Sequence, residues 1–333
     1  MKLKSLITTA AFTALSLCAP AAQAQRVVER TVARARAVVV SAASATEQTS
    51  AADASVVVTL ANISGQIKVH GWDRREVHVQ TEDNKRVELR REGGSNSSGP
   101  ATRLQVLFAR EAGNSDDEDY QECGEESDVT LDVPRGATVF LKTQSGDIEI
   151  ADIAEVHIET SSGDVDAHRI TKAIEVASAS GDLTIEDSTG RVRASSISGD
   201  VEAVNIRAND ASDFVRVKSV SGDVTLDRVN HARIDAGTVS GELGMTGQLA
   251  HGGSYEFQTV SGDVTLNLPS DASFRLDAQI FQGGDVSSDF NFRNVTRTVG
   301  SPIPTSHFVG TYGTGDATVN LRTISGTLRV RRR

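Results

Sequence analysis

One structural unit occurs twice within residues 174–203, IEVASASGDLTIEDSTGRVRASSISGDVEA. In each copy a segment of alternating apolar and polar residues leads into Ser-Gly-Asp, and a second alternating segment follows. The glycines of the two copies are Gly181 and Gly199. Alternation of this kind is typical of β-strands that bury one face. The stretch therefore predicts a strand, a corner and another strand.

The same unit recurs along most of the chain, which makes an internal repeat the dominant signal. Glycine follows serine at nine corners, and Gly283-Gly284-Asp285 forms a degenerate tenth. The nine glycines are Gly65, Gly146, Gly163, Gly181, Gly199, Gly222, Gly241, Gly262 and Gly326. From Gly146 to Gly284 the steps are 17 to 23 residues, but the last gap, to Gly326, is 42. We interpret that gap as two steps, one of which has lost its motif.

Alignment on glycine shows a change of parity at the corner. Apolar residues stand seven and five positions before glycine and again two and four positions after it, while Ser or Thr stands three before it in eight of nine copies, Asn62 being the exception. A continuous strand would bury the residue directly after glycine, which is Asp in seven of the ten corners. The chain must therefore turn or bulge at glycine, with Asp bonding nearby amides in an Asx-type turn.

Two all-β architectures fit this geometry. In a parallel β-solenoid of roughly ten rungs, equivalent residues stack on one another, whereas Gly-Asp could also form the loops of an antiparallel meander of repeated hairpins. The near-uniform Ser/Thr column and the regular rung length favour the solenoid.

We expect a signal peptide at 1–24, an Ala/Ser/Arg-rich leader at 25–54 and one repeat domain at 55–333, irregular over 55–135 and regular over 136–333.

The N-terminal residues indicate export. Lys2 and Lys4 precede an apolar run that ends at Cys18, and Ala22-Gln23-Ala24 provides a cleavage site. A lipid anchor on Cys18 is disfavoured because Leu17, rather than a small residue, precedes it. Cleavage would leave Cys123 as the single cysteine, so no intrachain disulfide is expected. No transmembrane segment is predicted in the mature chain.

The repeated corners and two further motifs resemble those of a known family. The repeated Ser-Gly-Asp-Val/Ile corners, the turn Val133-Pro134-Arg135-Gly136-Ala137 and the closing GTGDATVNLRTISGTLRV are similar to the bacterial "putative adhesin" domain family, whose function is unknown. The resemblance covers roughly residues 55–333. It implies a β-solenoid of the toast-rack type without established catalytic residues. The long acidic loop, the missing rung and the Arg-rich end depart from the family pattern.

Acidic residues are the first candidates for a site. A column of corner acids could bind calcium between rungs, but turn formation explains the same residues more simply. This column comprises Asp147, Asp164, Asp182, Asp200, Asp223, Glu242 and Asp263. A second acidic stretch, residues 114–128, lacks EF-hand spacing and is interpreted as a loop, as is the polar stretch 93–100.

Other residues give weaker signals. The seven histidines lack zinc-site spacing, and no serine lies in a nucleophile elbow. These histidines are His70, His78, His157, His168, His231, His251 and His307. The glycines of residues 310–315, GTYGTG, are followed by strand-like alternation rather than a helix, so we interpret them as turn glycines. We therefore assign no catalytic, cofactor-binding or metal-binding residue and expect no cofactor.

These observations favour an exported, non-enzymatic envelope or cell-surface protein of adhesin-like or structural type, with an unknown envelope protein or surface glycan as partner. The net charge of −11 becomes −13 when Lys2 and Lys4 are removed, which disfavours nucleic acid. A periplasmic scaffold or sensor in envelope-stress signalling is the alternative. A polysaccharide lyase is less favoured because the rungs are short and carry few loops.

Overall fold

The computed structural model describes residues 46–82, 85–92, 99–109, 120–121, 123–299 and 305–333. The predicted signal peptide at 1–24, residues 25–45 of the leader, residues 93–98 of the polar stretch and residues 114–119 and 122 of the acidic stretch lie outside these ranges. Within the described residues, no helix is long and apolar enough to cross a bilayer.

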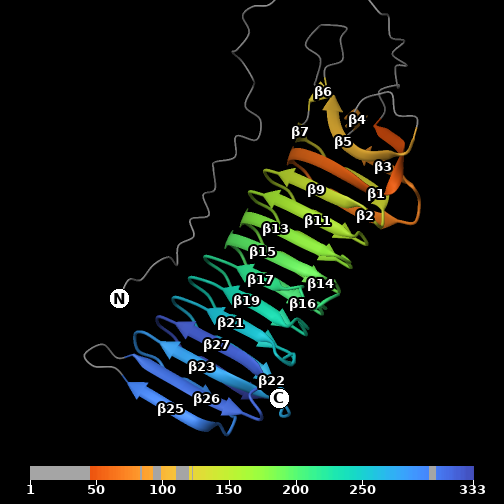
Figure 1. The fold of residues 1–333 in the computed structure, drawn as a ribbon. Coiled ribbons are helices and arrows are strands. Elements are labelled where there is room, and N and C mark those ends of the chain that lie inside the picture. The colour runs from red at the N-terminus through yellow and green to blue at the C-terminus, as the bar shows by residue number, and fades with distance from the viewer. Residues whose placement is uncertain (1–45, 83–84, 93–98, 110–119, 122, 300–304) are drawn as a thin grey trace, which may run out of the picture. The chain divides into compact units, whose positions relative to one another are not determined.

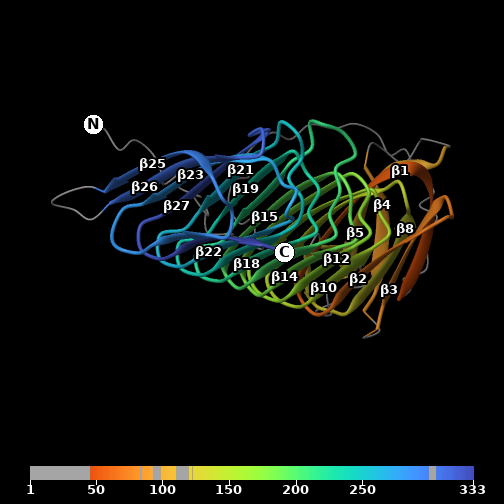
Figure 2. The ribbon, with the colours of Figure 1, turned by 90° about the horizontal axis from the view of Figure 1, so that it is seen from below.

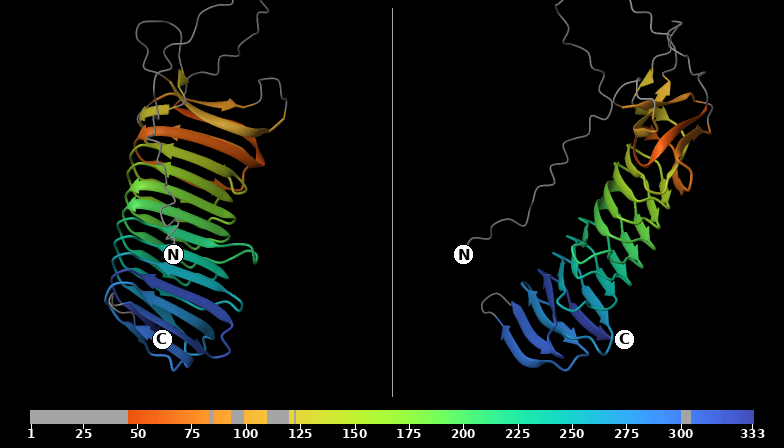
Figure 3. Two further views of the ribbon diagram at one scale, coloured as in Figure 1. Left: turned by 60° about the vertical axis from the view of Figure 1, so that its left-hand side comes forward. Right: turned by 45° about the vertical axis from the view of Figure 1, so that its right-hand side comes forward.

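The repeats form a parallel β-solenoid, so the hairpin meander is wrong and the stacked arrangement is confirmed. Each rung contributes one strand to each of two ladders, and strands of successive rungs lie side by side (Figures 1 and 3). Val156, for example, pairs with Ile174 and Ile174 with Val192, all in parallel register. Figure 2 shows both ladders, with β15 and β19 in one and β14 and β18 in the other.

The strands of the first ladder precede the corner glycines. In stack order they are β1 (Glu47–Ser64), β9 (Thr138–Thr143), β11 (Glu155–Thr160), β13 (Ala173–Ser180), β15 (Arg191–Ser198), β17 (Val215–Lys218), β19 (Arg233–Gly237), β21 (Ser254–Gln258), β27 (Ala317–Thr323) and β23 (Phe274–Ile280). The strands of the second ladder follow the glycines. They are β2 (Ile67–Trp72), β10 (Ile148–Ala151), β12 (Val165–His168), β14 (Leu183–Glu186), β16 (Val201–Val204), β18 (Val224–Asp227), β20 (Leu243–Thr246), β22 (Val264–Leu268), β28 (Leu328–Arg332) and β24 (Val286–Ser288).

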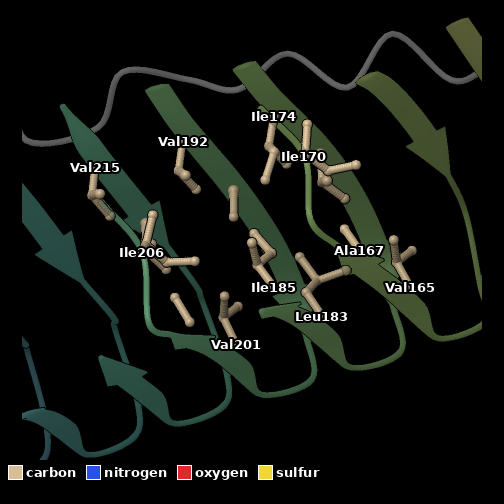
Figure 4. Close-up of a cluster of buried hydrophobic side chains, with 14 of the residues drawn as sticks. Val165, Ala167, Ile170, Ile174, Leu183, Ile185, Val192, Val201, Ile206 and Val215 are labelled. Carbon is tan, nitrogen blue, oxygen red and sulfur yellow. The ribbon is translucent and has the colours of Figure 1, made fainter. Parts of the chain in front are cut away.

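The core is the space between the ladders. The aligned apolar positions point inward from both strands of each rung, as the parity argument predicts. Figure 4 shows Val165, Ala167, Leu183 and Ile185 from the second ladder among these side chains. Because every rung repeats the inward positions, like stacks on like, and burial of these columns supplies the main favourable free energy of folding.

Chain order and stack order differ at the C-terminal end. Strand β27 lies between β21 and β23, and β28 lies between β22 and β24, so the rung that turns at Gly326 is inserted before the one that turns at Gly284. The expected lost rung between these glycines does not exist. Residues of this gap instead form the antiparallel hairpin of β25 (Arg293–Val299) and β26 (Ser306–Tyr312), which pairs with β23 and covers the end of the first ladder.

An aromatic cluster holds the β25–β26 hairpin, which we call the cap, against the end of the ladder. Phe274 is fully buried, and its ring contacts Phe290, Phe292 and Tyr312, with ring-centroid separations of 5.4, 5.7 and 6.1 Å. Edge-to-face packing of this kind stabilises beyond simple burial of area. The aromatic residues, scarce in the chain as a whole, therefore gather where a repeated column can no longer continue.

The N-terminal end is also interleaved. The strands there are β3 (Glu76–Thr81), β4 (Val87–Arg91), β5 (Ala101–Ala109), β6 (Tyr120–Gln121), β7 (Cys123–Glu126) and β8 (Val129–Pro134). Strands β7 and β8 form a rung that stacks outside β1 and β2. Its corner, Ser127-Asp128-Val129, lies in the segment interpreted as an acidic loop and lacks glycine. Strand β1 begins at Glu47, so regular structure starts before the expected boundary at residue 55.

Candidate functional site

The candidate site is the edge along which the Ser-Gly-Asp corners stack. The nine serine-linked glycines have φ between 108° and 153°, a region that L side chains rarely adopt. The rungs also approach each other very closely here. A Cβ on Gly199 would lie 2.2 Å from the carbonyl oxygen of Gly181, and one on Gly222 would lie 2.1 Å from that of Gly199. Glycine is therefore required both by its φ and by the neighbouring rung.

The corner acids bind the backbone of the next rung. The Asp164 carboxylate accepts the Asp182 amide N–H at 2.9 Å, and the Asp182 carboxylate accepts that of Asp200 at 2.8 Å. The same bond extends from Asp200 to Asp223 and from Asp223 to Glu242. These acids thus link rungs instead of closing an Asx-type turn within one corner. The prediction of a backbone role was right, but the partner is one rung further on.

Asp128 belongs to the same series. Its carboxylate accepts the Gln66 amide N–H at 2.7 Å, which places it in a corner rather than in an acidic loop. Among the residues that the structure describes, no three or more His, Cys, Asp or Glu side chains are grouped so that they could hold a metal ion.

A buried hydroxyl column satisfies the carbonyl groups of the corner. Thr160 donates to the Ser162 carbonyl at 3.0 Å, and Thr238 donates to the Gly222 carbonyl at 3.0 Å. Asn62, the exception in the sequence template, donates to the carbonyl groups of Ser64 and Ser127 and so performs the same task. Buried carbonyl groups need such partners, which explains the polar residue in an otherwise apolar inward face.

A second corner, not predicted from the sequence, lies six residues after five of the corner glycines. Asp152, Arg169, Asp187, Asn205 and Arg228 occupy it with φ between 49° and 63°, and a Cβ at Gly71, which holds the same place in its rung, would lie 1.8 Å from a backbone oxygen. The signal was the enrichment of Asp, Asn and Gly in this column, since Asn and Asp tolerate the left-handed region. Arginine at two of the five positions made this enrichment hard to recognise.

Asp152 is the most strongly perturbed acid of this second corner. Its side chain is 15% exposed and accepts hydrogen bonds from Arg169 at 2.7 and 3.0 Å and from Arg135 at 2.9 Å. The bonds from Arg169, followed by those from Arg135, lower the pKa of Asp152 from 3.8 to about 2. Three segments of the chain are thus joined through one carboxylate.

The lowered pKa gives a testable pH dependence. Above pH 3.8 the charged form of Asp152 stabilises the fold, and this contribution is lost as the pH falls through 3.8 towards 2. Asp152→Asn keeps a side chain that tolerates positive φ but removes the charge. We expect wild type to lose about 1–2 kcal/mol more than the variant between pH 5 and pH 2, after allowance for solvent screening. Urea unfolding at both pH values measures the difference.

Asp187→Asn is the matched control for this prediction. Asp187 occupies the same column with φ 49°, but its carboxylate accepts the Asn205 side-chain amide instead of an arginine. If Asp187→Asn flattened the pH dependence as much as Asp152→Asn does, the arginine pairs would not be its cause.

The outward side of the edge carries exposed aliphatic side chains at one repeat position, two residues before the corner glycine. We call these five residues the aliphatic row. It comprises Ile197, Val220, Val239, Val260 and Ile324, each 40–46% exposed. Phe281, 46% exposed, lies near the same corner edge in the adjoining rung, that of Gly284. The rungs that turn at Gly146, Gly163 and Gly181 carry Gln144, Ser161 and Ala179 at the same position.

A shallow hollow lies on the opposite side of the rungs. Its volume is about 420 Å³, and its lining includes Asn209, His231 and Leu249. His231 is only 1% exposed, and its Nε2 lies 2.8 Å from the Gly190 carbonyl oxygen, while Nδ1 has no hydrogen-bond partner. Burial lowers the pKa of His231, opposed by the bond to Gly190 and by the charge of Asp213. The neutral ring thus behaves as part of the packing.

Neutral His231 predicts loss of stability in mild acid. The unfolded chain protonates this histidine below its ordinary pKa of 6.5, whereas the folded protein resists protonation, so stability falls as the pH drops below 6.5. His231→Gln keeps a donor for Gly190 and removes the titration. The urea midpoint of wild type should fall more steeply than that of the variant between pH 7 and pH 5. Parallel pH profiles would contradict a neutral buried His231.

The other histidines face carboxylates, and two of them, His70 and His78, share Asp132. His78 lies between Glu47 and Asp132, His157 stacks on Phe140, and His307 faces Asp277. His70, His168 and His251 pair with acids at 3.4–3.8 Å. Gly313 and Gly315 have φ of 66° and 79° and form the turn between β26 and β27.

The fold and the edge can now be compared with known proteins. A "putative cell adhesion protein" from Clostridium sporogenes is 9% identical over 87% of this chain and 100% of its own, with a TM-score of 0.23. A "putative adhesin" from Parabacteroides distasonis is 9% identical over 86% of this chain and 96% of its own, with a TM-score of 0.35. Such distant likenesses show nothing of what this chain binds. No curated protein matches it. The family model described as Toastrack DUF4097 matches residues 50–331, and the protein therefore belongs to that family.

Proposed function

We propose that this protein is exported and acts as a non-enzymatic binding module at the bacterial envelope or cell surface, in an adhesin-like or structural role. The observation that carries this proposal is the aliphatic row. Five stacked aliphatic side chains on a solvent-exposed edge form a continuous apolar strip, and such strips on soluble proteins mark interaction sites. The partner we favour is an envelope protein.

The fold itself does not need the row. Gln144, Ser161 and Ala179 hold the same position in three neighbouring rungs, with the same parallel register and the same corner geometry. An aliphatic side chain at this outward position therefore adds little to folding. Exposed aliphatic side chains at this position occur in one contiguous set of rungs, whereas Ile63, at the same position of the Gly65 rung, is only partly exposed. This grouping supports a role in contact with a partner.

The non-enzymatic part of the proposal rests on how the corner residues are used. The glycines allow the close approach between rungs, most of the corner acids accept backbone amides, and hydroxyl groups of the buried column, with Ser196 as an exception, donate to carbonyl groups. Most of these groups therefore have a structural task. Incubation of the purified protein with polyuronates checks this point, and cleavage products that disappear on Asp182→Asn would overturn it.

Site-specific photo-crosslinking tests the binding role. A photoreactive amino acid is placed at Val239, at the centre of the row, and in a control at Val295, which is 50% exposed on β25 outside the row. We expect one discrete adduct with an envelope protein from position 239 and none from position 295. Equal labelling from both positions, or no adduct from 239, would count against the row as a binding surface.

Mass spectrometry of the secreted or periplasmic fraction tests export separately. The mature protein should begin at Gln25, after the predicted cleavage site. Recovery of the uncleaved chain from the cytoplasm would overturn the location.

A further inference from the structure

From the aliphatic row and its surroundings we infer that its occupant is a basic amphipathic helix of a protein partner, lying along the stack axis. This inference rests on the proposed binding function and identifies the class of partner. Three features of the edge support it: the spacing of the row, the charge beside it and the exposure of both.

The spacing of the row matches a helix better than a strand. Neighbouring rungs of a parallel stack are about 4.8 Å apart, so five aliphatic side chains extend over about 19 Å. One helical turn rises 5.4 Å, close to one rung, so a stripe at i, i+3, i+4 and i+7 stays near register for about 3.5 turns. Alternate residues of an extended strand lie about 6.7 Å apart and lose register after two rungs. A helix of roughly 13 residues or more therefore fits the row.

The charge beside the row is negative. Asp200, Asp223 and Glu242 follow the corner glycines in three of the rungs that carry the row, and all three are exposed. Within the described ranges, none of the three forms an ion pair with a Lys or Arg. Two of them accept an amide N–H through Oδ1 only, which leaves the carboxylate charge towards solvent.

On the other flank the cations are already paired. Lys218 forms an ion pair with Asp235, and Arg322 pairs with Glu256. The charge left unbalanced along the row is therefore that of the corner acids. A helix whose apolar stripe is bordered by Lys or Arg would bring the complementary charge and increase the association rate.

The same charge argues against two other occupants. A second copy of the mature chain would also carry a net charge of −13, which is −11 less Lys2 and Lys4, and an anionic lipid surface would be repelled by the corner acids. Both remain outcomes of the test. Dimers that disappear when the row is made polar would point to a second copy, and binding to phosphatidylglycerol vesicles through the row would point to lipid.

The test uses a blocked synthetic 18-residue helical peptide with a leucine stripe at i, i+3, i+4 and i+7 bordered by lysines. Two matched peptides are needed, one with glutamate in place of lysine and one with the lysine sequence scrambled. Binding to the mature full chain is followed by fluorescence anisotropy at low and high salt. We expect the lysine peptide to bind at least about tenfold more tightly than either matched peptide, with affinity falling as salt increases.

Two sets of variants separate the apolar and charged parts. Val220→Ser, Val239→Ser and Val260→Ser together copy the natural Ser161 and should weaken binding at least about tenfold. Asp200→Asn, Asp223→Asn and Glu242→Gln keep an acceptor oxygen and should remove most of the salt dependence. The control carries Val295→Ser and Val299→Ser, two exposed valines outside the row, and should bind as wild type does. Unchanged melting temperatures show that all three variants are folded.

Equal binding of the scrambled peptide, or wild-type binding by the triple serine variant, would overturn the helical occupant. The proposed function fails separately. If the peptide result is negative but Val239 still crosslinks to an envelope protein, the binding module remains and its partner has another form. If the peptide binds as expected but no adduct forms in the cell, the surface is confirmed in vitro and the envelope role is lost.

Discussion

Gly199→Ala should cost about 2–5 kcal/mol of unfolding free energy, although the substitution adds only one methyl group. At φ 130° an alanine is strained by about 1–2 kcal/mol, and its Cβ would lie 2.2 Å from the Gly181 carbonyl oxygen. The two rungs would have to separate, which breaks hydrogen bonds and adds about 1–3 kcal/mol of overpacking cost. Urea unfolding followed by circular dichroism measures the loss.

Gly252→Ala separates the two causes. Gly252 also has positive φ, 71°, but a Cβ there would meet nothing within 4 Å. Only the backbone term remains, so the expected cost is about 1–2 kcal/mol. If the two variants lost the same stability, close approach between rungs would not be what makes the corner glycines necessary.

Phe274→Ala should cost about 3–5 kcal/mol and release the C-terminal cap. Phe274 is fully buried and contacts three other aromatic rings, so truncation leaves a large cavity under the β25–β26 hairpin. In a repeat protein each rung contacts only its neighbours, so the damage should stay local. Hydrogen exchange should show faster exchange in β25 and β26, while β11 to β17 keep their protection.

Phe281→Ala is the matched control for the cap. It removes the same side chain from a position that is 46% exposed, so we expect a loss below about 1 kcal/mol. Unfolding of β11 to β17 together with the hairpin in Phe274→Ala would contradict a locally stabilised cap.

The corner could be predicted because the residues that determine its geometry are adjacent in the sequence. The parity change at glycine placed the inward and outward faces correctly on both strands, and the repeat length favoured the stacked ladder. Asn62 even shows why the template tolerated an exception, since its amide donates where a hydroxyl donates elsewhere. The role of Asp was only half predicted, because a sequence shows that a carboxylate stands beside an amide but not which rung supplies the amide.

The order of the stack could not be predicted. Regular spacing shows that rungs exist, but pairing of β27 with both β21 and β23 depends on long-range contacts that leave no local signal. The corner at Ser127 was not predicted because it lacks the glycine that defines the motif. The aliphatic row was visible in the sequence as Ile197, Val220 and Val239, at a position that the parity argument places outward. That these side chains form one contiguous strip depends on the order of the rungs, which the sequence does not show.

The inserted rung has a consequence for synthesis. Strand β23 is made before β27, yet its link to the rest of the ladder passes through β27, and β24 depends on β28 in the same way. While residues 317–332 are still in the ribosome, the rung of β23 and β24 and the hairpin on it lack the neighbouring rung that joins them to the ladder. In a chain interrupted before these residues, the edges of β21 and β22 would stay unpaired. The ladder can therefore be completed only after its last rung has been translated.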